Sequence, residues 1–377
     1  MKIQQNISLA KLTTMKIGGF AKYVLTIENR EDFRDAFDFI REKNLAWFVL
    51  GDGSNVIAHG DFNGAILLNR IKGFREVSDA VFQIGAGEIT DETIAKLCAK
   101  NLSGVECLSL IPGRVGALPV QNVGAYGQEI SQTLTELSVF DIRDNSFKIL
   151  KNSDCKFAYR DSIFKSQNNR HYIICDITLQ LNREFLQPPF YPALKNYFRE
   201  NNDHFAKTPA RASSCAQSQD SEKISRKILD SATDKSAQND DILASRKFSP
   251  QEIRDAVIAI RNSKLPPVRE IPSAGSFFKN PIVDANFAKN FLAKNPDAPH
   301  WPLENGREKL AAGWLLDRAG LKGFAKFGFQ LYPLNALVVT NVASENSAEN
   351  LAKFVAEITT IVREKFGVEL EQEPESL

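Results

Sequence analysis

Hydrophobic positions in the first 70 residues alternate between strand-like and helix-like spacing. Between residues 31 and 43, Phe33, Phe37 and Ile40 recur at helical spacing, which predicts a helix with one buried face. Short runs of β-branched and aliphatic residues on both sides predict strands at 23–27, 47–50 and 65–68. The pattern therefore predicts a small β-α-β unit.

A second mixed unit is predicted over residues 80 to 185. Thr90 is expected to cap a helix that carries Ile94 and Leu97. The stretch from 108 to 127 is too rich in Gly and Pro to form one regular element. Strands are predicted at 81–84, around 137–141 and around 172–181.

The last third of the chain again has the pattern of an ordered domain. Residues 249–252 (Ser-Pro-Gln-Glu) form a capping box with proline at the first helical position, which predicts the start of a helix. Apolar residues from Leu310 to Leu315 predict a helix face, and Gly320 is its expected stop. A strand at 336–339 and a long amphipathic helix around 351–362 are also predicted.

Residues 201–247 differ from the rest of the chain. They lack Gly, lack aromatic residues beyond Phe205, and mix Ser, Asp, Lys, Gln and Ala with little apolar periodicity. Such a composition buries too little apolar surface to offset the entropy of ordering. We therefore expect a disordered, low-complexity surface insertion, with a functional module as the alternative.

Composition and charge exclude several classes of protein. The 377 residues are 43% hydrophobic and 25% charged, which predicts a globular chain of two or three domains. The formal net charge is only +1, so no nucleic-acid partner is expected. No apolar run approaches the roughly 18 to 20 residues of a membrane span, and no signal peptide is evident. We expect a cytoplasmic monomer without a membrane partner.

Histidine and cysteine are scarce and scattered. The chain has four His and five Cys, with no C-x-x-C motif and no His pair at helical spacing. No metal site is therefore expected, and an odd number of cysteines fits a reducing compartment. If the chain is an enzyme, its chemistry is expected to come from something other than a metal or a thiol.

Two glycine-containing loops are candidates for binding an anionic cofactor. The first follows a predicted strand directly, and its glycines, hydroxyl and amide suit a phosphate, although an ordinary tight turn is the alternative. The second is too long and irregular to be a simple connection, which favours function over a glycine-rich crossover. The candidate residues are Gly51, Gly53, Ser54 and Asn55 in the first loop, and Pro112, Gly113, Gly116, Gln121, Asn122, Gly124, Ala125 and Tyr126 in the second.

Single polar residues elsewhere have both functional and structural interpretations. Arg160 either pairs with Asp161 or binds a carboxylate ligand as a two-pronged donor. Ser276 is not in a G-x-S-x-G elbow and has no nearby His, so a nucleophilic role is disfavoured, and proton donation would require a cation or a water network to assist it. Lys264 is a candidate cation or a solvated lysine at a helix end. The alternating Glu residues near the C-terminus form either a strand face or an acidic tail.

Taken together, these segments resemble the UDP-N-acetylenolpyruvoylglucosamine reductases, the MurB family. The resemblance covers nearly the whole chain apart from about 201–247, and its most specific parts are the 111–127 loop and the run 274–281 (Ala-Gly-Ser-Phe-Phe-Lys-Asn-Pro). The other matching segments are 13–19, 51–55, 85–88, 157–165 and 309–315.

The resemblance implies an α+β chain with an FAD-binding domain of the vanillyl-alcohol-oxidase (PCMH) type, made of two subdomains, and a C-terminal α+β substrate-binding domain. FAD would be bound non-covalently by the two loops, and NADPH would be the hydride donor. The implied division is 1–70 and 71–200 for the two FAD-binding subdomains, 201–247 for the insertion, and 248–377 for the substrate-binding domain.

The implied reaction reduces the enolpyruvyl group of UDP-N-acetylglucosamine enolpyruvate to UDP-N-acetylmuramate, a step of peptidoglycan precursor synthesis. Hydride would pass from NADPH to FAD and then to the vinyl carbon. Arg160 would bind the substrate carboxylate, Glu373 would orient or assist Arg160, and Ser276 would protonate the carbon that bears the ether oxygen. The implied substrate-binding residues are Tyr159, Tyr191 (the tyrosine of a capping loop), Lys264, Asn280 and Asn335.

Three positions depart from the family pattern. Arg114 occupies a loop position that is usually small, and Tyr332 stands where a His is common. Pro374 follows Glu373 and cannot donate to a sheet, so the sequence leaves open how rigidly Glu373 is held. An FAD-dependent oxidase of alcohols or sugars and a catalytically silent nucleotide-binding protein remain the alternative functions.

Overall fold

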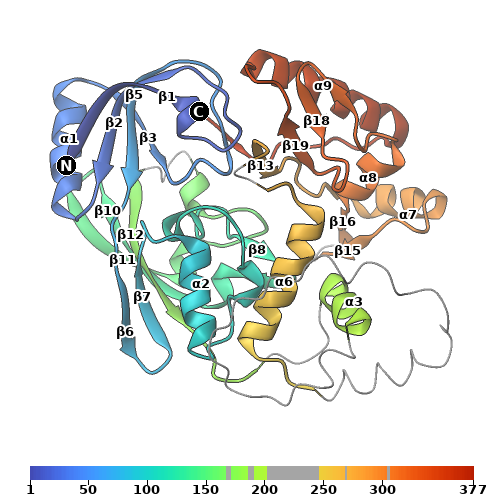
Figure 1. Cartoon of the computed structure of the whole chain (residues 1–377), viewed down its shortest axis with the longest axis horizontal. Helices are drawn as coiled ribbons and strands as arrows, with labels where there is room; N and C mark the ends of the chain where they lie inside the picture. Colours follow the sequence, from blue (N-terminus) through green and yellow to red (C-terminus); the bar gives the residue numbers. More distant parts are fainter. Residues whose placement is uncertain (167–170, 186–190, 202–245, 268–269, 304–305) are drawn as a thin grey trace.

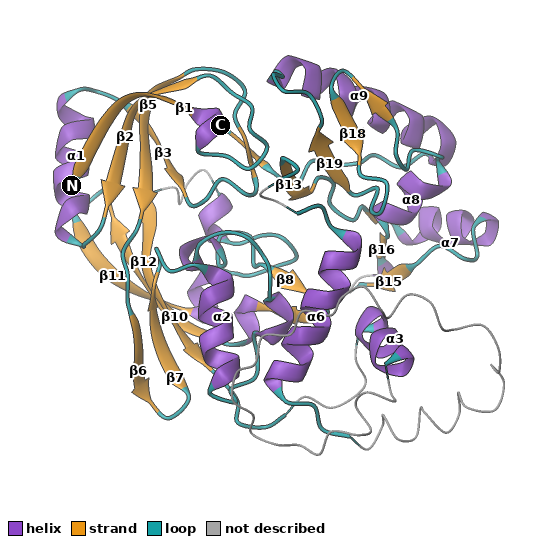
Figure 2. Cartoon of the chain, in the orientation of Figure 1, coloured by secondary structure: helices purple, strands orange, loops and turns teal. Residues whose placement is uncertain are grey.

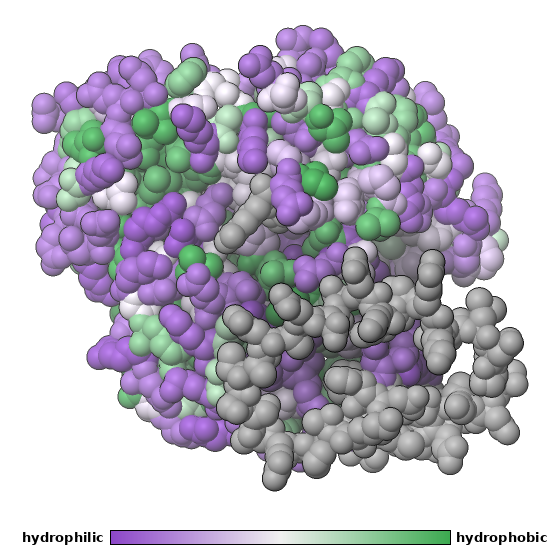
Figure 3. All heavy atoms as spheres, viewed as in Figure 1, coloured by the Kyte–Doolittle hydropathy of each residue, from purple (hydrophilic) through white to green (hydrophobic). Residues whose placement is uncertain are grey.

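Three parts surround a central cleft in the computed structural model (Figure 1). An N-terminal α/β part and a middle, mainly antiparallel β part lie next to each other, and the C-terminal part lies beside both (Figures 1 and 2). On the face shown in Figure 3, hydrophilic residues cover most of the surface. The structure describes residues 1–166, 171–185, 191–201, 246–267, 270–303 and 306–377. The core of the insertion predicted at 201–247 therefore lies outside the described residues.

The N-terminal sheet has the order β1-β2-β5-β3. The strands β2, β5 and β3 are parallel, and β1 is added antiparallel at the edge. Helix α1 covers one face, where Phe33, Phe37 and Ile40 are buried. The predicted β-α-β unit is thus confirmed. The elements are β1 (Lys2–Ser8), β2 (Phe20–Ile27), α1 (Glu31–Glu42), β3 (Ala46–Leu50), β4 (Val56–Ile57) and β5 (Phe62–Asn69).

The middle sheet is antiparallel, with the order β11-β10-β12-β7-β6. Helix α2 packs beside it, and Ile94 and Leu97 are buried as predicted. The prediction that Thr90 caps this helix is wrong: Thr90 is its first helical residue, Ile89 holds the cap position, and the Thr90 hydroxyl makes no cap bond. The elements are β6 (Phe74–Ser78), β7 (Val81–Gly85), α2 (Thr90–Ala99), β8 (Gly124–Ala125), β9 (Gln128–Glu129), β10 (Leu134–Asp141), β11 (Ser146–Lys151) and β12 (Tyr172–Gln180).

Helix α6 (Pro250–Lys264) lies between the middle part and the C-terminal part (Figure 1). The predicted capping box is confirmed, because the Ser249 hydroxyl accepts from the Glu252 N–H while the Glu252 carboxylate accepts from the Ser249 N–H. Ile253, Val257 and residues of α3 (Pro192–Glu200) form one small core. The packing fixes where the C-terminal end of α6 meets the cleft.

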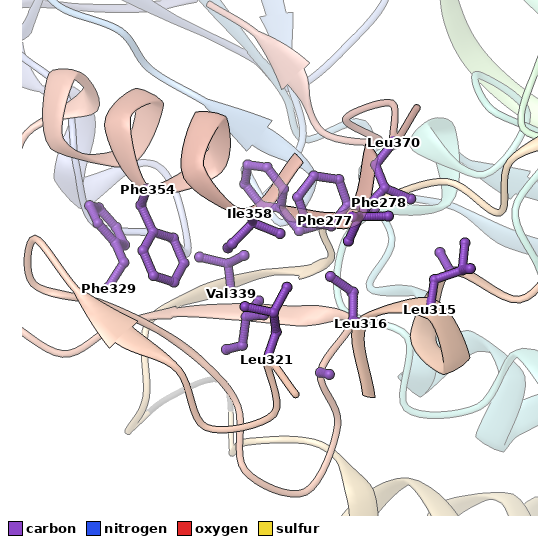
Figure 4. Close-up of a cluster of buried hydrophobic side chains, with 14 of the residues drawn as sticks. Phe277, Phe278, Leu315, Leu316, Leu321, Phe329, Val339, Phe354, Ile358 and Leu370 are labelled. Atoms are coloured by element: carbon purple, nitrogen blue, oxygen red, sulfur yellow. The ribbon is translucent and has the colours of Figure 1, made fainter. Parts of the chain in front are cut away.

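The C-terminal part contains a four-stranded sheet, β13-β19-β18-β17, and a three-stranded sheet, β14-β16-β15. Its core includes Phe277, Phe329 and Phe354 (Figure 4). The helix predicted from Leu310 begins only at Ala312, because Leu310 is the last residue of β16. The elements are β13 (Ser273–Ser276), β14 (Ile282–Val283), α7 (Ala285–Lys294), β15 (His300–Pro302), β16 (Glu308–Leu310), α8 (Ala312–Arg318), β17 (Ala325–Lys326), β18 (Phe329–Leu331), β19 (Val338–Asn341) and α9 (Ala348–Phe366).

The chain ends on the N-terminal part, where the mark C stands in Figure 1. The last strand, β20 (Glu375–Ser376), pairs in parallel with β4. Glu373 donates its N–H to the Phe277 carbonyl at 2.9 Å, and Glu375 donates to the Asn55 carbonyl at 2.9 Å. Glu373 is therefore held in place, since hydrogen bonds on both sides of Pro374 replace the donor that proline lacks.

Candidate functional site

A cleft of about 450 Å³ lies where the three parts meet, and a second chamber of about 370 Å³ adjoins it. Both chambers are lined by Phe48, Val49, Leu50, Gly51, Arg114, Ala117, Val120 and Glu375, so they form one elongated space. The larger chamber brings together residues of the two glycine-containing loops, the end of α6, β13 and the C-terminal tail.

The loop 51–55 lines the larger chamber with its backbone. Gly53 has a φ of +62°, and its missing Cβ allows the Leu12 and Thr13 backbone to pass within van der Waals contact. Among the described residues, no acceptor is bonded to the backbone N–H groups of 51–55. Ser54 donates to the Pro112 carbonyl at 3.0 Å and Asn55 donates to Gln121 at 2.9 Å, which ties this loop to the next one.

The loop 111–127 contributes the opposite edge of the same chamber. The lining candidates are Pro112, Gly113, Gln121, Gly124, Ala125 and Tyr126, whereas Gly116 lines the adjoining chamber. Asn122 lines neither chamber. It is 1% exposed, and its amide bonds Glu129, the Ala158 carbonyl and the Ser131 N–H, so it holds the loop in shape.

Thr90 adds an observation that the sequence did not predict. Thr90 lines the larger chamber, and its buried hydroxyl has no hydrogen-bond partner among the described residues. A buried polar atom without a partner is unusual, and Thr90 lines the same chamber as the free N–H groups of loop 51–55. This elongated space with unpaired donors fits a long, polar, phosphate-bearing cofactor such as FAD.

Arg160 and Glu373 form an ion pair inside the chamber. The Arg160 Nε lies 3.1 Å from the Glu373 carboxylate, without the alignment of a hydrogen bond, and Nη2 donates to the Gly124 carbonyl at 2.9 Å. Asp161, which the sequence offered as a partner, accepts instead from the Ser162 N–H. Arg160 thus keeps donors for a ligand while its position is fixed.

Burial raises the pKa of the Glu373 carboxyl, and the charges of Arg160, Lys165 and Lys279 only partly oppose this rise. Lys165 also lines the chamber. A carboxyl group with a raised pKa beside a cation is typical of functional sites, although structural ion pairs give the same sign.

Ser276 lines the chamber from an irregular edge of the C-terminal sheet. The pairing of β13 with β19 shifts register between Ser273 and Ser276, and Gly275 has a φ of +72°. The shift turns the Ser276 side chain to solvent, while Phe277 and Phe278 are fully buried directly after it. The Glu373 N–H donates to the carbonyl of Phe277, the residue after Ser276. This backbone hydrogen bond places Ser276 next to Glu373.

The C-terminal end of α6 supplies cations. Lys264 and Arg261 both line the chamber, one helical turn apart. The charge of Arg261 and its bond with the Tyr126 hydroxyl oppose the rise that burial gives the pKa of Tyr126. Tyr126 packs edge-to-face on Tyr191 at 5.9 Å, and Tyr191 and Asn335 complete this end of the chamber.

Two of the candidate substrate-binding residues, Tyr159 and Asn280, lie outside the lining of both chambers. Burial raises the pKa of the Tyr159 hydroxyl, and the charge of Arg160 and the neighbouring Asn280 oppose this rise. The Asn280 side-chain oxygen accepts from the Ala312 N–H at 3.0 Å. The Lys309 ammonium lies 4.3 Å from the Tyr159 ring centroid. These residues join the Arg160 segment to the C-terminal part.

The part of the chain that the structure describes has no group of three or more His, Cys, Asp or Glu placed to hold a metal ion. Within the same residues, none of the helices combines the length and apolar character that crossing a bilayer requires.

Comparison with known proteins gives the family. Residues 21–146 match the model of an FAD binding domain, and residues 266–377 match that of the UDP-N-acetylenolpyruvoylglucosamine reductase C-terminal domain. The UDP-N-acetylenolpyruvoylglucosamine reductase of Neisseria gonorrhoeae is 34% identical over 99% of this chain and 96% of its own, and that of Bdellovibrio bacteriovorus is 33% identical over 99% of both chains. The chain belongs to this reductase family.

A solved structure agrees on the fold. The UDP-N-acetylenolpyruvylglucosamine reductase of Thermus caldophilus covers 100% of this chain and 99% of its own, with a TM-score of 0.60 and 20% identity. The predicted α+β fold class, with an FAD-binding domain and a C-terminal domain, is confirmed. The chain is an FAD-dependent oxidoreductase.

Proposed function

We propose that this chain reduces the enolpyruvyl group of UDP-N-acetylglucosamine enolpyruvate to UDP-N-acetylmuramate, with non-covalent FAD and with NADPH as reductant. The family assignment supports the reaction. One observation of the structure supports the residue roles most directly: Arg160, Ser276 and Glu373 come from three distant segments and line one chamber together with a backbone cradle for an anionic cofactor.

The free N–H groups of loop 51–55 are the proposed contacts for the flavin nucleotide. When bound, FAD supplies the two-electron carrier between NADPH and the substrate. The adjoining chamber, lined by Gly116 and Arg114, extends the site far enough for a dinucleotide.

Arg160 is proposed to hold the substrate carboxylate and to stabilise the negative charge that develops beside it. The ion pair with Glu373 and the bond to the Gly124 carbonyl support this role, because they fix the guanidinium before substrate arrives. Ser276 is proposed to donate its hydroxyl proton to the carbon that bears the ether oxygen. Glu373 orients Arg160 and assists the proton transfer.

Lys264, Arg261, Tyr191 and Asn335 are proposed to bind the UDP part, since they line the end of the chamber beside α6. Tyr159 and Asn280 lie where the Arg160 segment meets the C-terminal part, and they are proposed to contact the substrate or to position the residues that do. We further propose a cytoplasmic monomer. The four described cysteines are buried free thiols, which is usual in a reducing compartment.

The test uses the purified protein under anaerobic conditions. Its visible absorbance is expected to show a flavin, NADPH should bleach that absorbance, and the enolpyruvyl substrate should restore it. A protein that holds no flavin would refute the proposal. If oxygen restored the bleached flavin absorbance but the enolpyruvyl substrate did not, an oxidase would be favoured instead.

A further inference from the structure

Arg114 lies at the junction of the two chambers. It lines both of them, and a Cβ built on Gly51 would lie 3.8 Å from the Arg114 side chain. The side chain therefore packs on the first residue of the loop whose N–H groups are free. A long ligand that occupies both chambers must pass Arg114.

The Arg114 guanidinium is held from one side only. Its Nε donates to Asp52 at 2.7 Å and its Nη1 donates to the Gly87 carbonyl at 3.0 Å. Of the five N–H groups of an arginine, three thus lack an acceptor among the described residues. An arginine that is fixed in place and still has spare donors is suited to bind phosphate, because little side-chain entropy remains to be lost.

The charge around Arg114 is not balanced. Arg70 shares the same carboxylate, at 3.4 Å from Asp52, and donates to the Gly51 carbonyl at 3.2 Å. Two guanidinium groups thus face one carboxylate at a partly buried site. Burial and the charge of Arg114 lower the pKa of Arg70, with Asp52 opposing them less. This surplus of positive charge at Asp52 favours an anion beside it, although the Glu375 carboxylate also lines both chambers.

We propose that Arg114 binds the pyrophosphate of FAD, with Asp52 and the Gly87 carbonyl holding its guanidinium in place. The inference rests on the flavin site proposed above. Neutral backbone donors of loop 51–55 and the charged fork of Arg114 act on the same group. Lys264 and Arg261 line only the larger chamber, so the cations for the nucleotide sugar are separate from Arg114.

The test measures flavin release from the holoenzyme. Purified holoenzyme is diluted in steps, and the rise of flavin fluorescence at equilibrium gives the Kd of FAD. R114Q and R114S are each expected to raise this Kd by about 10- to 100-fold, because a charge-assisted contact to phosphate is lost. Added salt should weaken FAD binding more in the wild type than in either variant. R183S is the matched control, since Arg183 is an exposed arginine that also pairs with a carboxylate, Asp79.

A double variant separates ligand binding from a structural role. If R114S weakened FAD binding only by removing one of the two cations that balance Asp52 beside the pyrophosphate, D52N/R114S would restore the wild-type Kd; we expect the double variant to remain weak. UDP-N-acetylglucosamine should bind all holoenzymes equally. The inference would be overturned if the double variant had the wild-type Kd for FAD, or if neither single variant changed this Kd. It would also be overturned if the single variants weakened only the binding of UDP-N-acetylglucosamine. A wild type without flavin would instead refute the proposed function.

Discussion

The two walls of the cleft are built in different ways. The flavin wall consists of two loops, 51–55 and 111–127, that offer mainly backbone groups, with Arg114 as a charged addition. The substrate wall gathers Arg160, Ser276 and Glu373 from segments far apart in the sequence. Backbone groups are neutral and keep their place without side-chain partners. The substrate wall instead depends on charged side chains that must be buried and paired.

This difference predicts two kinds of failure. A change on the flavin wall should alter folding or cofactor binding, because the backbone itself makes the contacts. A change on the substrate wall should alter one step of the reaction while the flavin stays bound. Four substitutions test this division, in order of decreasing expected effect.

Ser276→Ala tests the division most strongly. Without the hydroxyl proton, reoxidation of the flavin by the enolpyruvyl substrate should slow by about 10²- to 10⁴-fold. Flavin reduction by NADPH should keep its rate, because Ser276 takes no part in that half-reaction. Stopped-flow absorbance of each half-reaction measures both rates.

The matched control is Ser273→Ala. Ser273 lies in the same strand, but it is buried and does not line the chamber. Its loss should leave both half-reactions unchanged. If Ser276→Ala slowed the two halves alike, Ser276 would act on the flavin and the separation of the walls would fail at this residue.

Features set by neighbouring residues could be predicted from the sequence. The β-α-β unit and the Ser249 capping box follow from periodicity and from side chains three residues apart, and the structure confirms both. The loop 51–55 was identified by its glycines, and it lines the cleft. Such features need no knowledge of the rest of the fold.

Features set by long-range pairing could not be predicted. Glu373 is fixed by hydrogen bonds to Phe277 and, through Glu375, to Asn55, which the local sequence around Pro374 does not indicate. Thr90 was expected to cap α2, but it is the first helical residue and its buried hydroxyl has no partner among the described residues. Arg261 was overlooked, although its spacing of three residues before Lys264 on one helix was a usable signal.

Gly53→Ala is the corresponding test of the flavin wall. A Cβ at this position would lie 2.3 Å from the Leu12 carbonyl oxygen and 2.6 Å from the Thr13 Cα, at a φ of +62°. Strain and overpacking together should lower the free energy of unfolding by about 3 kcal/mol or more, with loss of flavin. Thermal unfolding and the ratio of flavin to protein absorbance measure the two effects.

Gly320→Ala separates strain from contact. Gly320 has a φ of +78°, but no atom lies within 4 Å of the Cβ that would be added. Its substitution should lower the free energy of unfolding by only about 1 to 2 kcal/mol and leave flavin bound. If both variants lost the same free energy of unfolding, the close approach of the Leu12 and Thr13 backbone to Gly53 would not contribute to stability.

Lys264→Ala should give a smaller effect on the substrate wall. Loss of one cation at the end of α6 should raise the KM for the enolpyruvyl substrate by about tenfold, the size of one charge-assisted bond. NADPH-driven flavin reduction should not change. Lys294, the last residue of α7 and exposed, provides the control in K294A. If Lys264→Ala and K294A had a similar KM for the enolpyruvyl substrate, Lys264 would not bind the substrate.

Glu373→Gln concerns the cost of burying charge on the substrate wall. Burial raises the pKa of this carboxyl in the folded chain, so the folded state disfavours its ionised form. The wild type therefore loses stability as the pH rises from the pKa of Glu373 in the unfolded chain to its higher pKa in the folded chain. The loss is complete once the pH is above the folded-state pKa. Gln carries no charge at any pH. The variant should unfold at a higher temperature than the wild type near pH 7, and the two should converge as the pH falls to about 4.

The expected gain is a few degrees at most, since one pKa unit corresponds to about 1.4 kcal/mol. Thermal unfolding between pH 4 and pH 8 measures it, with E371Q as the control because Glu371 is an exposed neighbour paired with Lys279. A slower reaction together with a more stable fold would show that the substrate wall sacrifices stability for chemistry. A variant less stable than the wild type at pH 7 would mean that the bond to Arg160 outweighs the burial of Glu373, and the contrast between the two walls would then rest on chemistry alone.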